Sequence, residues 1–162
     1  MVTVRLAERR DAEAIREIYN REVLEGTNTF DMVPRSLDDQ IRWIDEHSGG
    51  HPALVAVDGE DVLGFGSLSR FRDRPAYAPT VEDTVYVDPA HQRAGVGRAV
   101  LLELVGLAKA HGFHSVIARI VGGNEVSIRL HEACGFVVVG TEVEVGRKFG
   151  QWLDVVEMQR ML

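Results

Sequence analysis

The residue types and spacing between positions 92 and 99 indicate a site for a phosphate group. The run Gln92–Ala99 contains Gly95 and Gly97, follows the apolar stretch Thr84–Val87 and opens a long amphipathic pattern. That order is typical of a strand, a glycine turn and a helix. Such a turn presents backbone N–H groups at the positive end of a helix, and glycines let a ligand approach them closely. The spacing therefore predicts a site for a ligand that carries a pyrophosphate.

Two nucleotide-binding motifs come close to this spacing, and the chain matches neither. A dinucleotide-binding fingerprint needs a third glycine where Val100 stands. A P-loop needs Gly-Lys followed by Ser or Thr, and the chain has no such tripeptide. An ordinary strand-to-helix turn stays open as an alternative as long as the two glycines are considered alone.

Composition predicts one globular domain over residues 1–162. The net charge of −7 argues against nucleic-acid or anionic-membrane partners, and no apolar run approaches the roughly 18 residues of a membrane span. The only cysteine, Cys134, allows no internal disulfide, so we expect a reducing, cytoplasmic location. No His, Cys, Asp and Glu cluster has the spacing of metal ligands, so we expect no metal.

Periodicity predicts the elements that must position the glycine turn. Asp11 is a candidate cap for a helix that reaches about Leu24, and Ser36 begins a second helix with a capping-box pattern. The other expected elements are strands at Val2–Leu6, Ala53–Val57, Val62–Leu68, Thr80–Val87, Val116–Val121, Phe136–Val145 and Trp152–Met158, helices at Val96–His111 and Asn124–Cys134, and a turn at Gly146–Gly150. This order predicts an α/β or α+β fold with a mixed sheet of about seven strands and about four helices.

A second motif lies in Asn124–Phe136, with the pattern Asn-x-x-Ser-Ile-x-Leu-His-x-x-x-Gly-Phe. Together with Gln92, Gly95 and Gly97, it resembles the GCN5-related N-acetyltransferase (GNAT) superfamily over the whole chain. The resemblance implies that acetyl-CoA binds here, its pyrophosphate held by the amides of Ala94–Ala99. The cofactor residues that it implies are Val85, Tyr86, Val87, Arg93, Ala94, Gly95, Val96, Gly97, Arg98, Ala99, Asn124 and Ser127.

Four segments narrow the resemblance to the phosphinothricin and methionine sulfoximine acetyltransferases. They are Thr27–Phe30, Thr80–Val87, Arg129–Glu132 and Gly150–Val155. That group acetylates the α-amine of small amino-acid-like molecules. It also has histidine where His131 stands, whereas the wider superfamily usually has tyrosine.

Glu82 is the candidate general base. An α-ammonium must lose a proton before it attacks a thioester, and a carboxylate beside the acceptor can accept that proton. The resemblance places the base of this group at Glu82, and strand alternation turns Val81 and Asp83 to the opposite face. A solvated glutamate on a sheet face is the alternative.

His131 is the second candidate catalytic residue, because it lies two helical turns after Asn124 on nearly the same face. There it could protonate the leaving thiolate or share the role of base with Glu82. The alternative is a core histidine that is satisfied by hydrogen bonds. No nucleophile–base pair stands out, so we expect direct transfer rather than an acetyl-enzyme.

The acceptor's anionic groups need cations, and Arg72 and Arg74 lie in the loop before Glu82. Phe30 and Tyr77 are candidate walls of the acceptor site. Lys148 is a further candidate, since in the resembling enzymes the last hairpin approaches the partner subunit's site, which implies a homodimer.

The expected protein is an acetyl-CoA-dependent N-acetyltransferase of small amino-acid analogues. A protein or peptide acetyltransferase and a catalytically silent CoA-binding module remain alternatives.

Overall fold

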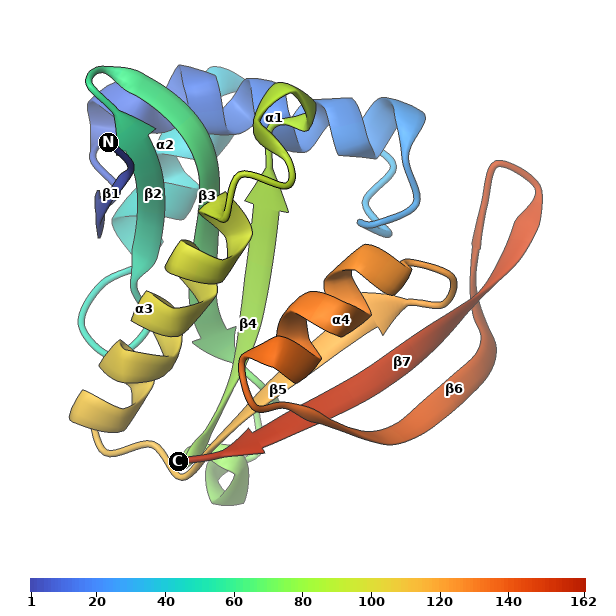
Figure 1. Ribbon diagram of the computed structural model, residues 1–162. Helices are drawn as coiled ribbons and strands as arrows, with labels where there is room; N and C mark the ends of the chain where they lie inside the picture. The colour runs from blue at the N-terminus through green and yellow to red at the C-terminus, as the bar shows by residue number, and fades with distance from the viewer.

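The computed structural model describes residues 1–162 and contains one seven-stranded sheet with the strand order β1-β2-β3-β4-β5-β7-β6 (Figure 1). All neighbouring strands are antiparallel except β4 and β5, which are parallel. The strands are β1 (Thr3–Leu6), β2 (Ala53–Asp58), β3 (Asp61–Arg70), β4 (Thr80–Val87), β5 (Ser115–Val121), β6 (Val137–Lys148) and β7 (Gln151–Met161). The helices are α1 (Ala12–Glu25), α2 (Leu37–Glu46), α3 (Val96–Ala110) and α4 (Glu125–Ala133). The expected fold class is confirmed.

The helices cover the two faces of the sheet in pairs (Figure 1). One core cluster forms where α3 packs on the sheet, with Val100, Leu104 and Val81 among its buried members. A second, smaller cluster lies under α1 and α2 on the opposite face, around Ile15 and Phe65. The sheet is therefore the middle of three layers, and each of its faces has its own apolar core.

Local capping sets where two of the helices begin. The Ser36 hydroxyl accepts from the Asp39 N–H, and the Asp39 carboxylate accepts from the Ser36 N–H, so the expected capping box forms. The Asn124 side chain accepts from the Ser127 N–H at 3.2 Å and caps α4. Asp11 does not cap α1, because its carboxylate instead binds the Arg5 guanidinium at 2.7 and 2.9 Å.

The ladder between β4 and β5 is short. It pairs Thr80 with Ser115, Val81 with Val116 and Glu82 with Ile117, and then it ends. Beyond that point β4 stays paired with β3, while β5 continues along β7. The two halves of the sheet therefore separate after the third residue of β4 and stay apart over the rest of the strand, which leads to the glycine turn.

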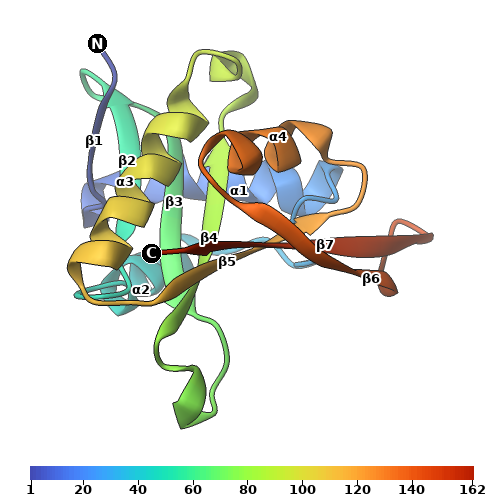
Figure 2. The same cartoon turned by 60° about the horizontal axis from the view of Figure 1, so that its bottom comes forward.

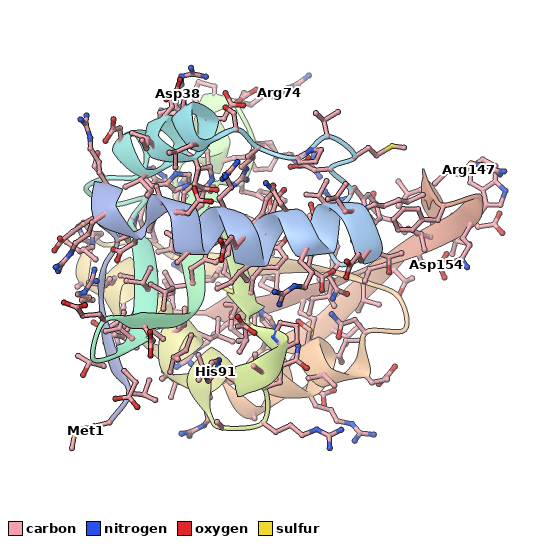
Figure 3. The ribbon with its side chains drawn as sticks, turned by 90° about the horizontal axis from the view of Figure 1, so that it is seen from above. Met1, Asp38, Arg74, His91, Arg147 and Asp154 are labelled. Carbon is pink, nitrogen blue, oxygen red and sulfur yellow. The ribbon has the colours of Figure 1, made fainter.

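Strands β6 and β7 form a long hairpin that projects from the body of the molecule (Figure 2), with Arg147 and Asp154 toward its far end (Figure 3). The sequence predicts a turn over Gly146–Gly150, but β6 continues to Lys148 and the turn consists of Phe149 and Gly150, both with positive φ. Tight hairpin turns of this kind need such left-handed residues. None of the helices is both long enough and apolar enough to cross a membrane.

Gly66 of β3 gives a direct test of how closely α3 packs on the sheet. A Cβ added there would lie 2.6 Å from the Thr84 carbonyl oxygen and 2.7 Å from Val100 Cγ1. We expect Gly66→Ala to lower the free energy of unfolding by about 1–3 kcal/mol, the usual cost of overpacking. Urea denaturation measures the change.

Gly106 supplies the matched control, because a Cβ there would have no heavy atom within 4 Å and the residue is inside α3. Gly106→Ala should raise the free energy of unfolding by about 0.5–1 kcal/mol through helix propensity. Equal effects of the two substitutions would contradict the packing described for Gly66.

Candidate active site

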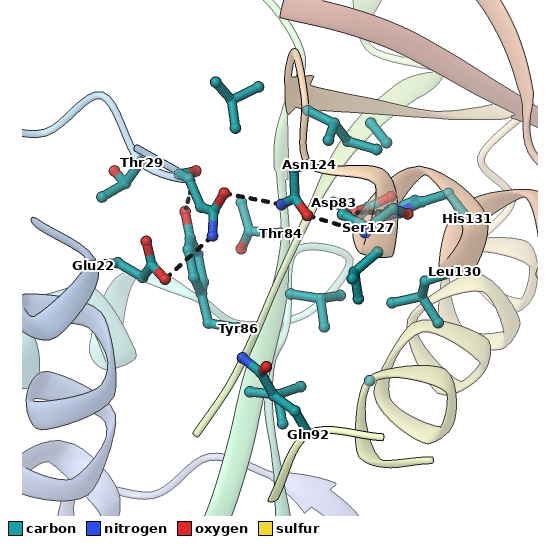
Figure 4. A pocket seen from close by; sticks show the side chains of 18 of the residues that line it. Glu22, Thr29, Asp83, Thr84, Tyr86, Gln92, Asn124, Ser127, Leu130 and His131 are labelled. Atoms are coloured by element: carbon teal, nitrogen blue, oxygen red, sulfur yellow. Dashed lines mark hydrogen bonds and ion pairs between the residues drawn. The ribbon is translucent and has the colours of Figure 1, made fainter. Parts of the chain in front are cut away.

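The separation of β4 from β5 opens onto a cavity of about 630 Å³. Its walls come from the end of α1 and the loop after it, from β4 and β5, from the glycine turn and from α4 (Figure 4). The sequence-predicted residues that line it are Phe30, Glu82, Val85, Tyr86, Val87, Arg93, Gly95, Val96, Gly97, Arg98, Asn124, Ser127 and His131. The glycine turn and Glu82 therefore belong to one cavity.

The glycine turn presents free backbone donors to this cavity. Arg93 and Gly95 both have positive φ, 63° and 80°, so the chain reverses sharply before α3. The Ala99 N–H donates to the Gly95 carbonyl at 3.0 Å in the first turn of the helix. The amides of the three residues before it, Val96 to Arg98, have no intrahelical acceptor. These three amides are suited to hold an anion.

Two of the predicted cofactor residues, Ala94 and Ala99, do not line the cavity. The amide of Ala99 is already used within α3. Ala94 stands between two residues that do belong to the cavity lining. At Gly97 there is little room for a side chain, because an added Cβ would lie 3.1 Å from Leu130 and 3.4 Å from Val87.

Glu82 lies at the last residue pair of the β4–β5 ladder and is half-buried. Its neighbours Val81 and Asp83 are buried on the α3 and α4 side, so Glu82 faces the other side of the sheet. Burial raises the pKa of the Glu82 carboxyl, and the positive charges of Arg119 and Arg72 partly offset this effect. A raised pKa brings the carboxylate closer to the strength that a general base needs near neutral pH.

His131 is buried and forms a pair with Asp83 (Figure 4). Its Nε2 lies 3.0 Å from Asp83 Oδ1, and its Nδ1 lies 2.8 Å from the carbonyl oxygen of Ser127. Both neighbours are acceptors, so the ring is satisfied best with a proton on each nitrogen. Burial lowers the pKa of His131, but the hydrogen bond and charge of Asp83 outweigh it and the pKa is raised.

The geometry of this pair changes the interpretation of His131. Both ring nitrogens are engaged within the protein, so neither has a lone pair directed at a reacting group. Of the two interpretations drawn from the sequence, the arrangement favours the histidine that is satisfied by hydrogen bonds. Of the two candidate catalytic residues, Glu82 is therefore the one that is available to accept a proton in the cavity.

A chain of hydrogen bonds crosses the cavity wall and includes a residue that the sequence did not single out (Figure 4). The Asn28 side chain donates to Glu22 at 3.2 Å and accepts from the Asn124 amide at 2.9 Å. Asn124 in turn caps α4 through Ser127. Asn28 therefore links the loop after α1 to the start of α4. The segment Thr27–Phe30 is part of the family resemblance, and only this long-range contact distinguishes Asn28 within it.

Lys148 does not line the cavity of its own chain. Its buried ammonium donates to the carbonyls of Thr29 at 2.9 Å and Glu22 at 3.2 Å, and burial lowers its pKa. It therefore fastens the end of β6 to the last turn of α1 and to the loop after it. Phe30 of that loop packs over Gly146, where an added Cβ would come within 2.4 Å of the ring.

The loop from Arg70 to Tyr77, the arginine loop, lines a separate cavity. Arg72, Arg74 and Tyr77 line a space of about 610 Å³ together with Arg70, Phe71 and Asp73, and none of them lines the larger cavity. This loop precedes β4, at the opposite end of that strand from the glycine turn (Figure 1). Arg72 remains close enough to Glu82 for its charge to lower the carboxyl pKa.

The buried His131–Asp83 pair predicts a pH-dependent contribution to stability. Because the folded-state pKa of His131 is raised above 6.5, the stabilisation is complete below that pH and is lost as the pH rises through the folded-state value. Asp83→Asn should lower the free energy of unfolding by about 3–5 kcal/mol at pH 5.5. Urea unfolding from pH 5.5 to 9 should show this difference shrinking as the pH increases.

His131→Gln serves as the companion variant, since it removes the titrating ring itself. Its difference from the unsubstituted protein should shrink over the same pH range. A difference that stays constant from pH 5.5 to 9 for both variants would contradict a protonated His131 in the folded protein.

Comparison with known proteins identifies the family to which this fold and cavity belong. The sequence pattern of the acetyltransferase (GNAT) domain matches residues 4–156. An L-methionine sulfoximine/L-methionine sulfone acetyltransferase of Salmonella typhimurium is 38% identical over 99% of this chain and 95% of its own length. A phosphinothricin N-acetyltransferase of Alcaligenes faecalis is 40% identical over 99% of this chain and 82% of its own.

Solved structures agree with this result. An acetyltransferase of Salmonella typhimurium with its cofactor acetyl-CoA superimposes with a TM-score of 0.96 at 38% identity, covering 99% of this chain and 94% of its own. A phosphinothricin acetyltransferase of Sinorhizobium meliloti in complex with acetyl-CoA gives 0.95 at 40% identity, with 99% and 88% covered. Sequence, fold and cavity thus lead to one assignment: the chain belongs to the GNAT family of acetyltransferases.

Proposed function

We propose that this protein transfers the acetyl group of acetyl-CoA to the α-amine of a small amino-acid analogue such as phosphinothricin, methionine sulfoximine or methionine sulfone. The observation that carries the proposal is the position of Glu82, a half-buried acid in the same cavity as the glycine turn. The relatives that are 38–40% identical to this chain carry these substrates in their names.

The residues present fit acetyl-CoA. The free amides of Val96, Gly97 and Arg98 form a cradle for its pyrophosphate. Beyond Glu82, β4 has no strand partner on its β5 side, so its backbone groups can pair with the amides of an extended ligand. When bound, acetyl-CoA supplies the thioester carbonyl carbon that an amine attacks.

Glu82 supplies the proton transfer in this proposal. Its carboxylate accepts a proton from the acceptor's ammonium, directly or through one water, which frees the nitrogen lone pair. The nitrogen–carbon bond forms as the carbon–sulfur bond breaks. The nitrogen loses its second proton to solvent, and the thiolate leaves and takes up a proton from solvent. His131 takes no part in proton transfer, because both of its nitrogens are engaged. Its pairing with Asp83 instead fastens α4 to β4 beside the cavity.

The arginine loop is the proposed site of the acceptor's anionic groups. Arg72 and Arg74 lie in a cavity next to the start of β4, and planar guanidinium groups suit carboxylate and phosphinate oxygens. The positive charge of Arg72 also lowers the pKa of the Glu82 carboxyl. In this arrangement the ammonium lies at Glu82 while the anionic end lies toward Arg72 and Arg74.

A substrate panel tests the proposed function. We expect thiol release from acetyl-CoA with phosphinothricin, methionine sulfoximine or methionine sulfone as acceptor, followed with a thiol reagent. Glu82→Gln should lower kcat by about 100-fold or more at neutral pH, since a general base contributes about that much.

Controls separate the proposal from its rivals. Glu144→Gln provides a matched control, because it neutralises an exposed glutamate on the same sheet that does not line the cavity. Acetylation of a peptide N-terminus without acetylation of any of the three small acceptors would overturn the substrate assignment. Acetyl-CoA binding without thiol release for any amine would overturn the enzymatic assignment, and an unchanged rate for Glu82→Gln would remove Glu82 from the mechanism.

We also propose that the protein is a cytoplasmic homodimer that binds neither nucleic acid nor membranes. The support for a dimer is the edge strand β6, which exposes Val137, Val138, Val139, Val143 and Val145. A long edge strand with exposed apolar residues is typically covered by a partner. The net charge and the single, unpaired cysteine support the other parts of this proposal.

Sedimentation equilibrium measures the assembly directly. The expected mass is twice the 18.0 kDa of one chain. Val143→Glu should shift the equilibrium toward the monomer, since Val143 is 73% exposed in one chain and a charge there would be buried at the interface. A monomer mass for the unsubstituted protein at all concentrations would contradict the homodimer.

A further inference from the structure

A row of charged residues crosses the sheet on the face that carries Glu82. Glu82 is opposite Ile117 in the register, Arg119 is two residues further along β5, and Arg119 is opposite Glu157 of β7. Residues directly opposite each other point to the same face, as do residues two apart in one strand. Glu142 of β6 joins the row through its contact with Arg119. Four adjacent strands thus each contribute one charge.

Arg119 is held in a defined position within this row. Its Nη2 donates to Glu142 Oε1 at 2.6 Å, and its Nε lies 3.4 Å from Glu157 Oε1. Two carboxylates on neighbouring strands therefore fix two sides of one guanidinium. The side chain also lines the large cavity, as Glu82 does. This arrangement keeps a positive charge at the cavity wall beside the proposed base.

The positive charge of Arg119 offsets part of the effect of burial on the Glu82 carboxyl. A carboxylate can act as a base only when it is ionised, and partial burial of Glu82 disfavours the ionised form. The charges of Asp83 on the same strand and Glu157 on β7 act in the same direction, whereas Arg119 and Arg72 act in the opposite one. Arg72 lies on an exposed loop, where solvent screens its charge. Arg119 is the cation that the sheet itself fixes near Glu82.

We propose that Arg119 is a positioning residue of this active site, whose guanidinium, held by Glu142 and Glu157, keeps the Glu82 carboxylate ionised so that it can accept the acceptor's proton. This inference rests on the proposed function, since it assigns a purpose to the ionised state of Glu82. Arg119 also makes the site sensitive to charge changes on β6 and β7, which contain no proposed catalytic residue.

The test compares substitutions that should act in opposite directions. Arg119→Met should move the acid limb of the kcat/KM pH profile to higher pH, with a loss of about threefold or more at pH 6 and less than about twofold on the plateau. Glu157→Gln should move the same limb to lower pH. Titration of the acceptor's own amine is common to all variants, so only differences between profiles are read.

A direct titration separates this proposal from the proposed function. The Glu82 carboxyl is followed by ¹³C NMR in protein labelled at its glutamate side chains, with Glu82→Gln used to assign the resonance. Arg119→Met should raise the titration midpoint, Arg119→Lys should hold it nearer to the original value, and Glu157→Gln should lower it. This readout requires no activity, so it remains valid even where Glu82→Gln leaves the rate unchanged and the role of base fails.

Arg16→Met is the matched control. Arg16 is 31% exposed and pairs with Glu13 at 2.7 Å, and Arg119 is 34% exposed and pairs with Glu142 at 2.6 Å. Arg16 contacts neither cavity, so its substitution should leave both the pH profile and the Glu82 midpoint in place. A midpoint that does not move in Arg119→Met, or that moves in the same direction in Glu157→Gln, would overturn the proposal.

Discussion

The hydrogen-bonded ladder between β4 and β5 ends after Glu82 and Ile117, although both strands continue. From that point β4 belongs to the β3 side of the sheet and β5 to the β7 side. Backbone N–H and C=O groups require partners, so the free edge of β4 must find them in water or in a ligand. The same separation therefore creates the cavity and supplies the groups that can hold an extended molecule within it.

Strand alternation places the adjacent acids Glu82 and Asp83 on opposite faces of the sheet and so gives them different roles. Asp83 points toward α4 and is neutralised by His131, so its charge contributes to stability and fixes a helix that lines the cavity. Glu82 points to the other face, where the charges of Arg119 and Arg72 partly offset the effect of burial on its pKa. A shift of one residue in the register would exchange the two environments. The register of β4 thus determines which carboxylate is available for chemistry.

The sequence predicts the fold class, most element boundaries and the glycine turn, because these depend on short-range patterns of apolar residues, caps and glycines. It could not predict what Lys148 does, because its buried contacts with Glu22 and Thr29 join segments more than 100 residues apart. The same holds for Asn28, whose partner Asn124 lies 96 residues away. Arg119 carried no signal either, since only the strand order brings it to the same face as Glu82.

Glu82 can act as the base only if the acceptor binds on the face of the sheet to which Glu82 points. A crystal structure of the protein with CoA and an N-acetylated amino-acid analogue shows that face directly. We predict the amide nitrogen on the Glu82 side of β4, within about 3.2 Å of the carboxylate or joined to it by one water. We also predict the pyrophosphate at the amides of Val96, Gly97 and Arg98. An amide nitrogen beside His131, with Glu82 separated from it by the strand, would contradict the role of Glu82 as the base.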